Sequence, residues 1–506
     1  MATISYPGVY IQELDSGVRV INGVSTSITA FVGRATRGPT DVPTRVQNFG
    51  EYSRTFGDLS PDCPMGFAIA QFFDNGGSDA LVIRVHNLSA ANAEDRAEVD
   101  VPSDGGTPMH LFAASPGTWG NQVRVSVTRP GTGTAFHLTV QEVSSANPAQ
   151  VLTEERFLNL TLTAGDPRFV TDVLTAQSRL IRLGTLSQGR PQATGAALAF
   201  QGGDNGRPIG AAQVSDVGLQ AGRKGIYALE NADLFNLLCI PPFAPGVQPA
   251  QATWDAAATY CQDRRAMLLV DAKQDWADPA AVVAGLSGWV TRSANAALYF
   301  PWIRVANPLN ENRLESFAPC GAVAGVIART DATRGVWKAP AGQEATLSGV
   351  SELDVRLTDQ QHGILNPLGV NCLRTFPVAG RVVWGARTLR GADELADQWA
   401  YLPVRRLALF IEESLYRGTQ WVVFEPNDEP LWSQIRLNVG AFMNGLFRRG
   451  AFQGTTPAQA YFVRCDRTVN PQEDIDRGIV NIIVGFAPVK PAEFVVISIQ
   501  QIRPGA

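Results

Sequence analysis

Few side chains in this sequence have the spacing that a catalytic or metal-binding site needs. The four histidines are scattered, and no HExxH pair occurs among them: His86, His110, His137 and His362. The six cysteines also stand singly, without a CxxC pair, so neither a zinc site nor a thioredoxin-like site is predicted. Most of them lie in apolar stretches such as NLLCIPP and APCGAV, which predicts small buried side chains. No metal or cofactor is expected.

Motifs for nucleotide or acyl chemistry are missing as well. There is no GxxxxGK[ST] loop to hold phosphates, and GLSGW lacks the spacing of a GxSxG elbow. His362, in TDQQHGILNP, is the best-placed candidate for a general base, although a structural role is the plainer expectation. Basic and aromatic residues do not interleave as base stacking would require, so nucleic acid is not an expected partner.

Composition indicates a folded protein of several domains. The chain has 506 residues, of which 45% are hydrophobic and 18% charged, and its formal net charge is −5. This balance is typical of a core-forming protein of about three domains, without bulk attraction to nucleic acid or anionic membranes. No stretch reaches the roughly 18 apolar residues of a membrane span, and no signal peptide is recognised. We therefore expect synthesis in the cytoplasm and no insertion into a membrane.

The pattern of apolar and polar residues changes along the chain. Residues 27–33 and 80–85 read as buried strands around an apolar helix. Residues 90–207 alternate apolar and polar side chains, which predicts an inserted antiparallel β domain. From about 225, strands alternate with helices, which predicts a mostly parallel sheet. After about 389 we expect two helices separated by a short strand WVVF, then three closing strands.

Several long motifs in this sequence resemble those of contractile tail sheath proteins. The first are YPGVYIQEL, STSITAFVGRATRGP and FFDNGGSDALVIRV; ARTDATRGVWKAPAG follows at residues 328–342. The C-terminal motifs are VRRLALFIEESLYRGTQWVVFEPNDEPLW, FRRGAFQGTTPAQAYFVRCD and VGFAPVKPAEFVVISIQQ. The resemblance covers about 1–90 and 205–503. Phage tails, bacteriocins and extracellular injection systems all use such sheaths, and the sequence does not choose among them.

The resemblance implies a multidomain α+β and α/β fold. An inner α+β core domain would combine residues 21–90 with residues 345–490, and residues 206–344 would form a middle α/β domain with a mostly parallel sheet. Residues 91–205 would form the outer, mostly-β insertion. Residues 1–20 and 491–506 would be terminal arms whose strands are exchanged with neighbouring subunits.

The resemblance also implies a structural role and no enzyme activity. The subunit would form stacked hexameric rings in a helical sheath around an inner tube protein, closed by baseplate and terminal cap proteins, in a virion tail or injection particle. The exchanged strands would add to sheets in neighbours by main-chain hydrogen bonds. Their candidate residues are Tyr6, Val9, Tyr10, Ile11 and Glu13 at the N-terminus, and Phe494, Val495, Val496, Ile497 and Ile499 at the C-terminus.

A cationic helix offers a candidate contact with the tube. In PLWSQIRLNVGAFMNGLFRRGAF, apolar residues recur every three or four positions, and Arg436, Arg448 and Arg449 lie off that face. The resemblance places this helix toward the tube; an ordinary solvated helix end is the alternative. Two other classes stay open for the whole chain. One is a cytosolic α/β hydrolase with a lid insertion, and the other is a non-contracting structural tail protein.

Overall fold

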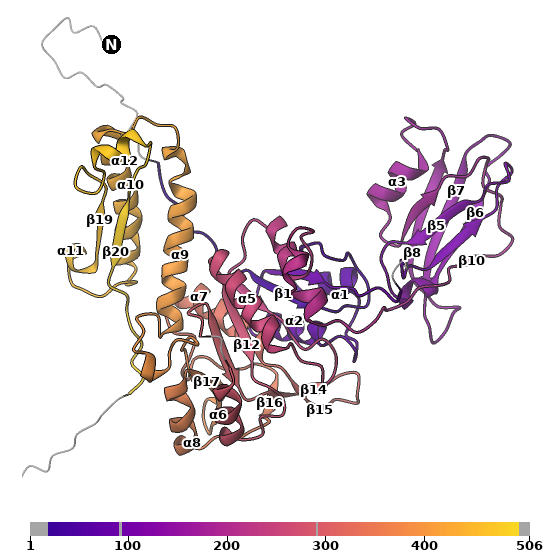
Figure 1. Cartoon of the computed structure of the whole chain (residues 1–506). Helices are drawn as coiled ribbons and strands as arrows, with labels where there is room; N and C mark the ends of the chain where they lie inside the picture. Colours follow the sequence, from indigo (N-terminus) through magenta and orange to yellow (C-terminus); the bar gives the residue numbers. More distant parts are fainter. Residues whose placement is uncertain (1–18, 91–93, 290–291, 495–506) are drawn as a thin grey trace, which may run out of the picture. The chain divides into compact units, whose positions relative to one another are not determined.

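The computed structural model describes residues 19–90, 94–289 and 292–494 (Figure 1). The chain divides into two compact units. The first, which we call the terminal unit, holds residues 1–26, 330–339 and 401–506. The second, which we call the sheet unit, holds residues 27–329 and 340–400. The expected arm residues at positions 1–18 and 495–506 lie outside the described part of the chain.

An eight-stranded mixed sheet forms the centre of the sheet unit. Its inner strands pair in parallel, and each edge strand, β18 or β2, pairs antiparallel with its neighbour. β1, β3, β12 and β13 are buried along their whole lengths, as parallel strands covered on both faces must be. The spatial order is β18 (Gly380–Val383), β17 (Val370–Phe376), β13 (Ala296–Phe300), β12 (Met267–Asp271), β11 (Leu237–Cys239), β1 (Thr29–Gly33), β3 (Ala80–Arg84) and β2 (Thr44–Val46).

Helices cover both faces of this sheet. On one face, Leu238 and Leu268 share a core cluster with Trp254 and Cys261 of α5 (Gln251–Asp263). On the other, α2 (Pro64–Asp74) packs closely against α7 (Cys320–Arg334). A Cβ on Gly321 would come within 2.0 Å of the Ala68 carbonyl oxygen, so only glycine permits this approach. The other helices of the unit are α1 (Phe49–Phe56), α4 (Ala211–Val214), α6 (Pro279–Ser287) and α8 (Asp359–Leu365), with short 3₁₀ turns η2 (Val217–Leu219), η3 (Gly225–Asn231), η4 (Asn366–Leu368) and η5 (Asp393–Leu395).

A small second sheet lies beyond the carboxyl ends of the central strands. It is antiparallel, with β14 (Ile303–Asn307) between β15 (Arg313–Phe317) and β16 (Val350–Leu353). The expected single strand AALYFPWIRV is therefore divided: β13 ends at Phe300, and β14 begins after Pro301 in a different sheet. Proline lacks the N–H that would continue the ladder, which explains the division.

Two sheets and one helix form the inserted β region. Its core joins both sheets, with Leu111, Val125 and Leu138 buried together with Leu174 of α3 (Val170–Gln177). The alternating burial along the strands explains the alternating sequence. The first sheet is β4 (Glu98–Val101), β5 (Met109–Ala113) and β9 (Ile181–Thr185); the second is β10 (Leu198–Ala199), β6 (Val123–Thr128), β7 (Phe136–Val143) and β8 (Val151–Leu160), with η1 (Thr118–Gln122) before β6.

Two arginines fasten the insertion to the central sheet region. The buried guanidinium of Arg84 donates to the carbonyl oxygens of Ala35, Gly38 and Pro116, at 2.8–2.9 Å. Arg37 forms an ion pair of 2.9 Å with Glu142 on β7. These three hydrogen bonds to carbonyl oxygens offset part of the free-energy cost of burying the charge of Arg84.

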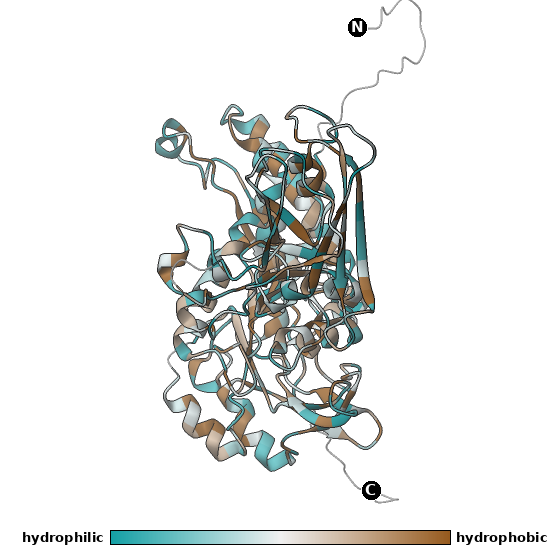
Figure 2. Cartoon of the chain, turned by 90° about the vertical axis from the view of Figure 1, so that its right-hand side faces the viewer, coloured by the Kyte–Doolittle hydropathy of each residue, from teal (hydrophilic) through white to brown (hydrophobic). Residues whose placement is uncertain are grey.

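The terminal unit consists of helices around a two-stranded hairpin. Its long helices are α9 (Leu402–Gly418) and α10 (Glu429–Arg448), with the short η6 (Gln420–Val422), α11 (Pro457–Ala460) and α12 (Gln472–Asp476). Asp428 caps α10 by accepting from the Leu431 amide. β19 (Tyr461–Arg464) and β20 (Ile483–Phe486) pair antiparallel. None of the helices in the described residues is long and apolar enough to cross a membrane, and hydrophobic residues alternate with hydrophilic ones along the ribbons of Figure 2.

The structure corrects the expected domain grouping in one respect. The sequence resemblance placed 21–90 with 345–490 in an inner domain. Instead β1, β2 and β3 lie in the same sheet as β11, β12 and β13, because Thr29–Phe31 pair with Leu237–Cys239. Residues 345–400 contribute β16, β17 and β18 to the sheet unit, so of the expected segment 345–490 only the part from residue 401 belongs to the terminal unit.

Candidate assembly surface

The segment that follows the expected N-terminal arm lies on α9 and α10. The Arg19 amide donates to Asn438 Oδ1 and the Val24 amide to Ser414 Oγ, both at 3.2 Å. The Arg19 guanidinium lies 4.7 Å from the centre of the Trp421 ring, and Ile21 is buried in the core of the terminal unit. The chain is thus fixed to the terminal unit from Arg19 onward.

A buried ion pair ties this segment to two helices. Arg406 of α9 donates to both carboxylate oxygens of Asp331, at 2.8 and 2.5 Å, and also to the carbonyl oxygen of Thr26 at 2.8 Å. Asp331 belongs to the ARTDATRG motif and Arg406 to VRRLALF. Sequence reasoning did not single out either residue, although both stand in motifs that carried the resemblance.

The β19–β20 hairpin covers α10 with only two strands. Tyr461 and Val463 of β19 pack toward the core of the terminal unit, as do Val484 and Phe486 of β20. Phe462, on the opposite face, is 46% exposed. Within the described residues no third named strand pairs with the hairpin, although Phe452 forms an isolated antiparallel bridge with Pro488 and the Gln453 amide donates to the Ala487 carbonyl oxygen just after β20. A two-stranded sheet is marginally stable by itself.

The predicted arm residues fall almost entirely outside the described part of the chain. Tyr6, Val9, Tyr10, Ile11 and Glu13 do so, as do Val495, Val496, Ile497 and Ile499. Phe494 is described, and its side chain is 76% exposed. Just before it, Glu493 accepts a 3.5 Å hydrogen bond from the Tyr401 hydroxyl.

The three predicted arginines of α10 do not form one group. Arg436 is held within the subunit: it donates to Cys465 O, to Glu429 Oε1 at 2.5 Å and to Ser433 Oγ at 2.8 Å. Its hydrogen bond holds the pKa of Glu429 below the usual value. Arg448 and Arg449 lie together and exposed at the C-terminal end of the helix, with Arg449 stacked 5.1 Å over Trp337.

The connection between α9 and α10 differs from the expected strand. Residues 421–424, WVVF, form the end of η6 and a loop, since Pro426 and the cap of α10 follow at once. Phe424 has a left-handed φ of 72° and a fully exposed side chain. The apolar content of this stretch favoured a strand, but Trp421 and Val422 instead pack against the helices of the terminal unit.

The candidate catalytic residues do not come together as a site. His86 is buried against Asp95 at 2.8 Å, and burial lowers the pKa of its imidazole. His362 lies on α8, and His110 and His137 lie on strands of the insertion. All six cysteines are buried and free, as the sequence predicted. Across the described ranges, no group of three His, Cys, Asp or Glu side chains could hold a metal ion.

Two family models match this chain. The phage tail sheath protein central domain matches residues 219–389, and the phage tail sheath C-terminal domain matches residues 395–502. Together they cover more than half of the sequence. The first contains the carboxyl half of the sheet unit, and the second contains α9, α10 and the β19–β20 hairpin.

Two proteins with similar sequences are described as tail sheath proteins. The tail sheath protein of Vibrio phage KVP40 is 30% identical over 174 residues, which are 34% of this chain and 24% of that protein. A putative prophage major tail sheath protein of Pseudomonas aeruginosa (strain UCBPP-PA14) is 24% identical over 308 residues, 60% of this chain and 76% of the relative. The similarity to the KVP40 protein thus spans about a quarter of its length.

Solved structures of contracted sheaths share the fold over almost the whole length. The anti-feeding prophage helical sheath in the contracted state has a TM-score of 0.59 and 25% identity, covering 99% of this chain and 100% of that one. The sheath of an extracellular contractile injection system (PVC), also contracted, has a TM-score of 0.61 and 21% identity, covering 99% of both chains. These matches define a structural sheath protein of phages or injection systems. The chain belongs to the contractile tail sheath family.

Proposed function

We propose that this chain is the subunit of a contractile sheath that polymerises around an inner tube. The observation that carries the proposal is the β19–β20 hairpin of the terminal unit, a sheet of only two named strands within the described residues. Strands from neighbouring copies would complete it. Contraction from a metastable extended state would then drive the tube through a target envelope.

Strand exchange gives links that are strong and yet tolerant of rotation. An added strand alongside the four residues of β19 would make about four main-chain hydrogen bonds, each contributing ~1 kcal/mol net. Burial of Tyr10 or Ile497 would add about 1.5–3 kcal/mol per side chain. Main-chain bonds make few demands on side chains, so subunits could change orientation without releasing their neighbours.

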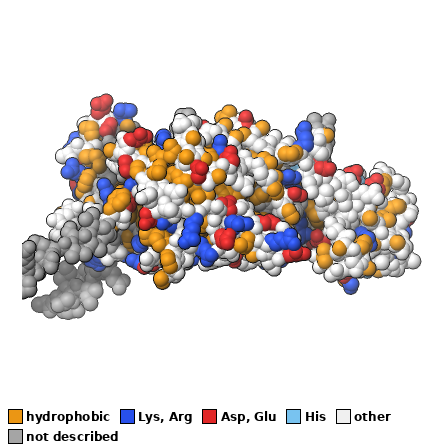
Figure 3. All heavy atoms as spheres, turned by 90° about the horizontal axis from the view of Figure 1, so that it is seen from below, with side chains coloured by type: hydrophobic (Ala, Val, Ile, Leu, Met, Phe, Trp, Pro, Cys, Tyr) orange, Lys and Arg blue, Asp and Glu red, His pale blue; other side chains and the backbone are white. Residues whose placement is uncertain are grey.

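The exposed surface supports an assembled role. Hydrophobic side chains gather over the middle of the face seen in Figure 3, among scattered acidic and basic ones. Contacts with other chains in a polymer would cover such a surface. Arg448 and Arg449 would face the tube, where charge complementarity sets register. Arg436 would instead stabilise the subunit through Glu429 and the end of β19.

Within the sheath, residues 1–20 and 491–506 would be the exchanged arms, and residues 91–205 would form the outer domain. Baseplate and cap proteins would close the polymer, and no catalytic step is needed in this subunit. The named relatives are phage and prophage sheath proteins, and one of the similar structures is the sheath of an extracellular contractile injection system, so either kind of particle fits.

Electron microscopy of the purified full chain tests the proposal. We expect long tubes of uniform width from the chain alone. Co-assembly with its tube protein should yield a second, more extended helical geometry. A monodisperse monomer with hydrolytic turnover would contradict the proposal in favour of an enzyme, and a single geometry under all conditions would indicate a non-contracting protein.

A further inference from the structure

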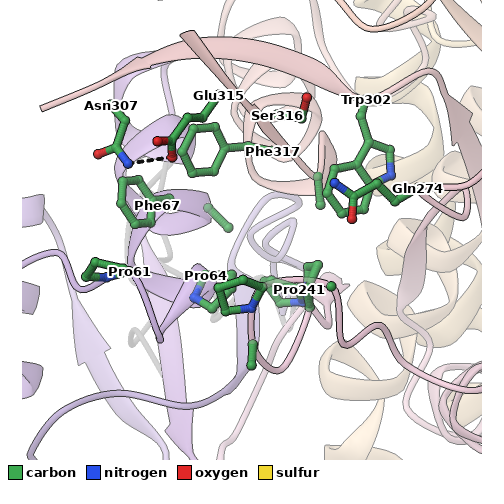
Figure 4. Close-up of a pocket in the computed structure, with 16 residues that line it drawn as sticks. Pro61, Pro64, Phe67, Pro241, Gln274, Trp302, Asn307, Glu315, Ser316 and Phe317 are labelled. Carbon is green, nitrogen blue, oxygen red and sulfur yellow. Dashed lines mark hydrogen bonds between the residues drawn. The ribbon is translucent and has the colours of Figure 1, made fainter. Parts of the chain in front are cut away.

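A cavity of about 180 Å³ opens at the carboxyl ends of the central strands (Figure 4). Residues that follow β11, β12 and β13 line it, among them Pro241, Gln274 and Trp302. Pro64 and Phe67, at the start of α2, also line the cavity. In doubly wound α/β sheets, this edge is where ligands bind.

The walls of this cavity are rigid and apolar. Five prolines line it, and prolines carry no N–H that could bind a phosphate or a carboxylate. The rings of Phe67 and Phe317 lie 4.7 Å apart and form one side. The indole N–H of Trp302 already donates to the Ala272 carbonyl oxygen at 2.7 Å. The lining prolines are Pro61, Pro64, Pro241, Pro242 and Pro245.

One carboxylate is the only charge among the residues that line the cavity. Glu315 accepts from Asn310 through Oε1 at 2.7 Å and from Asn307 through Oε2 at 2.6 Å. These two amide donors hold the pKa of Glu315 below its usual value. Figure 4 shows the Asn307 bond, with Glu315 beside the ring of Phe317. Each carboxylate oxygen keeps a second lone pair for a ligand.

We propose that this cavity binds an arginine side chain presented by a peptide segment of another protein chain. Its methylene stem would lie against the prolines, and its guanidinium would stack on the Phe67–Phe317 pair and donate to Glu315. An apolar cavity of roughly 150 Å³ holds a benzene molecule, so one long side chain fits this volume. The proposal goes beyond the sheath function, which does not depend on it.

Ligand-observed NMR with the full-length chain tests this site directly. The probe is N-acetyl-Ala-Arg-Ala-amide, and its neutral match carries citrulline, which has the shape of arginine without the charge. We expect saturation transfer to the arginine probe and binding of the citrulline probe weaker by about tenfold, the effect of losing one charge-assisted hydrogen bond. Equal binding of both probes, or no transfer to either, would overturn the proposal.

A pair of variants connects the binding to Glu315. Glu315→Gln should remove the preference for arginine over citrulline. Glu311→Gln makes the same charge change on the adjacent exposed turn, where Glu311 pairs only with Arg313, and should keep the preference. Ala244→Trp, at the half-buried rim, should block both probes. A preference for arginine that survives Glu315→Gln would overturn the assignment, with thermal melting used to verify that each variant is folded.

Discussion

Arg406 and Asp331 form a bidentate ion pair that is almost fully buried, with side-chain exposures of 3% and 4%. Removal of one partner from such a pair leaves an uncompensated buried charge, whereas removal of both does not. The pair joins α9 to the last turn of α7, and the third bond of Arg406, to Thr26, extends it to the N-terminal segment. It therefore holds together three distant parts of the sequence in the terminal unit.

We predict that Arg406→Met will lower the free energy of unfolding by about 3–5 kcal/mol, because Asp331 loses its partner. The double variant Arg406→Met, Asp331→Leu should recover much of this loss. Arg45→Met is the matched control, since Arg45 pairs with Asp79 at the surface and should cost less than about 1 kcal/mol. Urea denaturation measures all three. A loss for Arg406→Met no larger than for Arg45→Met would contradict the prediction.

Stability should depend on pH through Asp271. Burial raises the pKa of this carboxyl to about 7; its Oδ1 accepts from the Cys320 amide at 2.8 Å, and the side chain of Cys320 also hydrogen-bonds to the carboxyl group. The folded chain therefore keeps a proton that the unfolded chain loses above about pH 4. This stabilisation is full below pH 4 and is lost as the pH rises through 7, on the order of 4 kcal/mol in total.

The variant Asp271→Asn should flatten this dependence between pH 5 and pH 8, as measured by urea denaturation at each pH. Asp278→Asn is the control, because Asp278 caps α6 at an exposed position and its loss should leave the slope unchanged. A wild-type chain that is equally stable at pH 5 and pH 8 would contradict the assignment to Asp271.

Two glycines in helices should respond oppositely to alanine. Gly440, inside α10, has open space where a Cβ would stand, so Gly440→Ala should stabilise the subunit by roughly 0.5–1 kcal/mol. Gly321→Ala should destabilise it, because its Cβ would strike the backbone of α2 at Ala68. Thermal melting of the two variants measures the sign. Stabilisation by both would contradict the tight α2–α7 contact.

The arginines at the end of α10 should matter for assembly rather than folding. Arg448→Glu with Arg449→Glu should impair assembly around the tube at low salt, while the melting temperature changes little. Lysine at both positions should retain assembly. Arg436→Glu should instead lower the melting temperature, since it breaks the bonds to Glu429 and Cys465. Normal tube assembly by the double glutamate variant would count against a tube-facing role.

The spacing of apolar residues and the composition were enough to predict many, but not all, of the local elements of this chain. The buried strands at residues 29–33 and 267–271 are recognisable as short apolar runs, and the apolar face of α10 follows from Trp432, Ile435 and Val439. The prediction of a strand at WVVF was wrong, because apolar content does not reveal whether another strand is available to pair with it. In the structure, its residues pack against helices.

Long-range pairing could not be read from the sequence. The position of β1 beside β11 depends on hydrogen bonds between residues about 200 positions apart, with the whole insertion between them. The same holds for Arg406, whose partner lies 75 residues away and gives no local signal. Nor could the sequence show that Arg436 already forms hydrogen bonds within the subunit, because its acceptor, the carbonyl oxygen of Cys465, is a main-chain atom just after β19.

Melting and assembly of an arm-deleted subunit, measured in the same preparation, test the central claim most directly. The chain without residues 1–12, or without residues 495–506, should keep the melting temperature of the full chain, because in the proposed exchange both segments pair with neighbouring copies and not with the core of their own subunit. The same preparation should fail to form tubes, since the β19–β20 edges of each copy would lack their added strands. A deleted subunit that melts early and aggregates would contradict strand exchange, and one that still forms normal contractile tubes would contradict it equally.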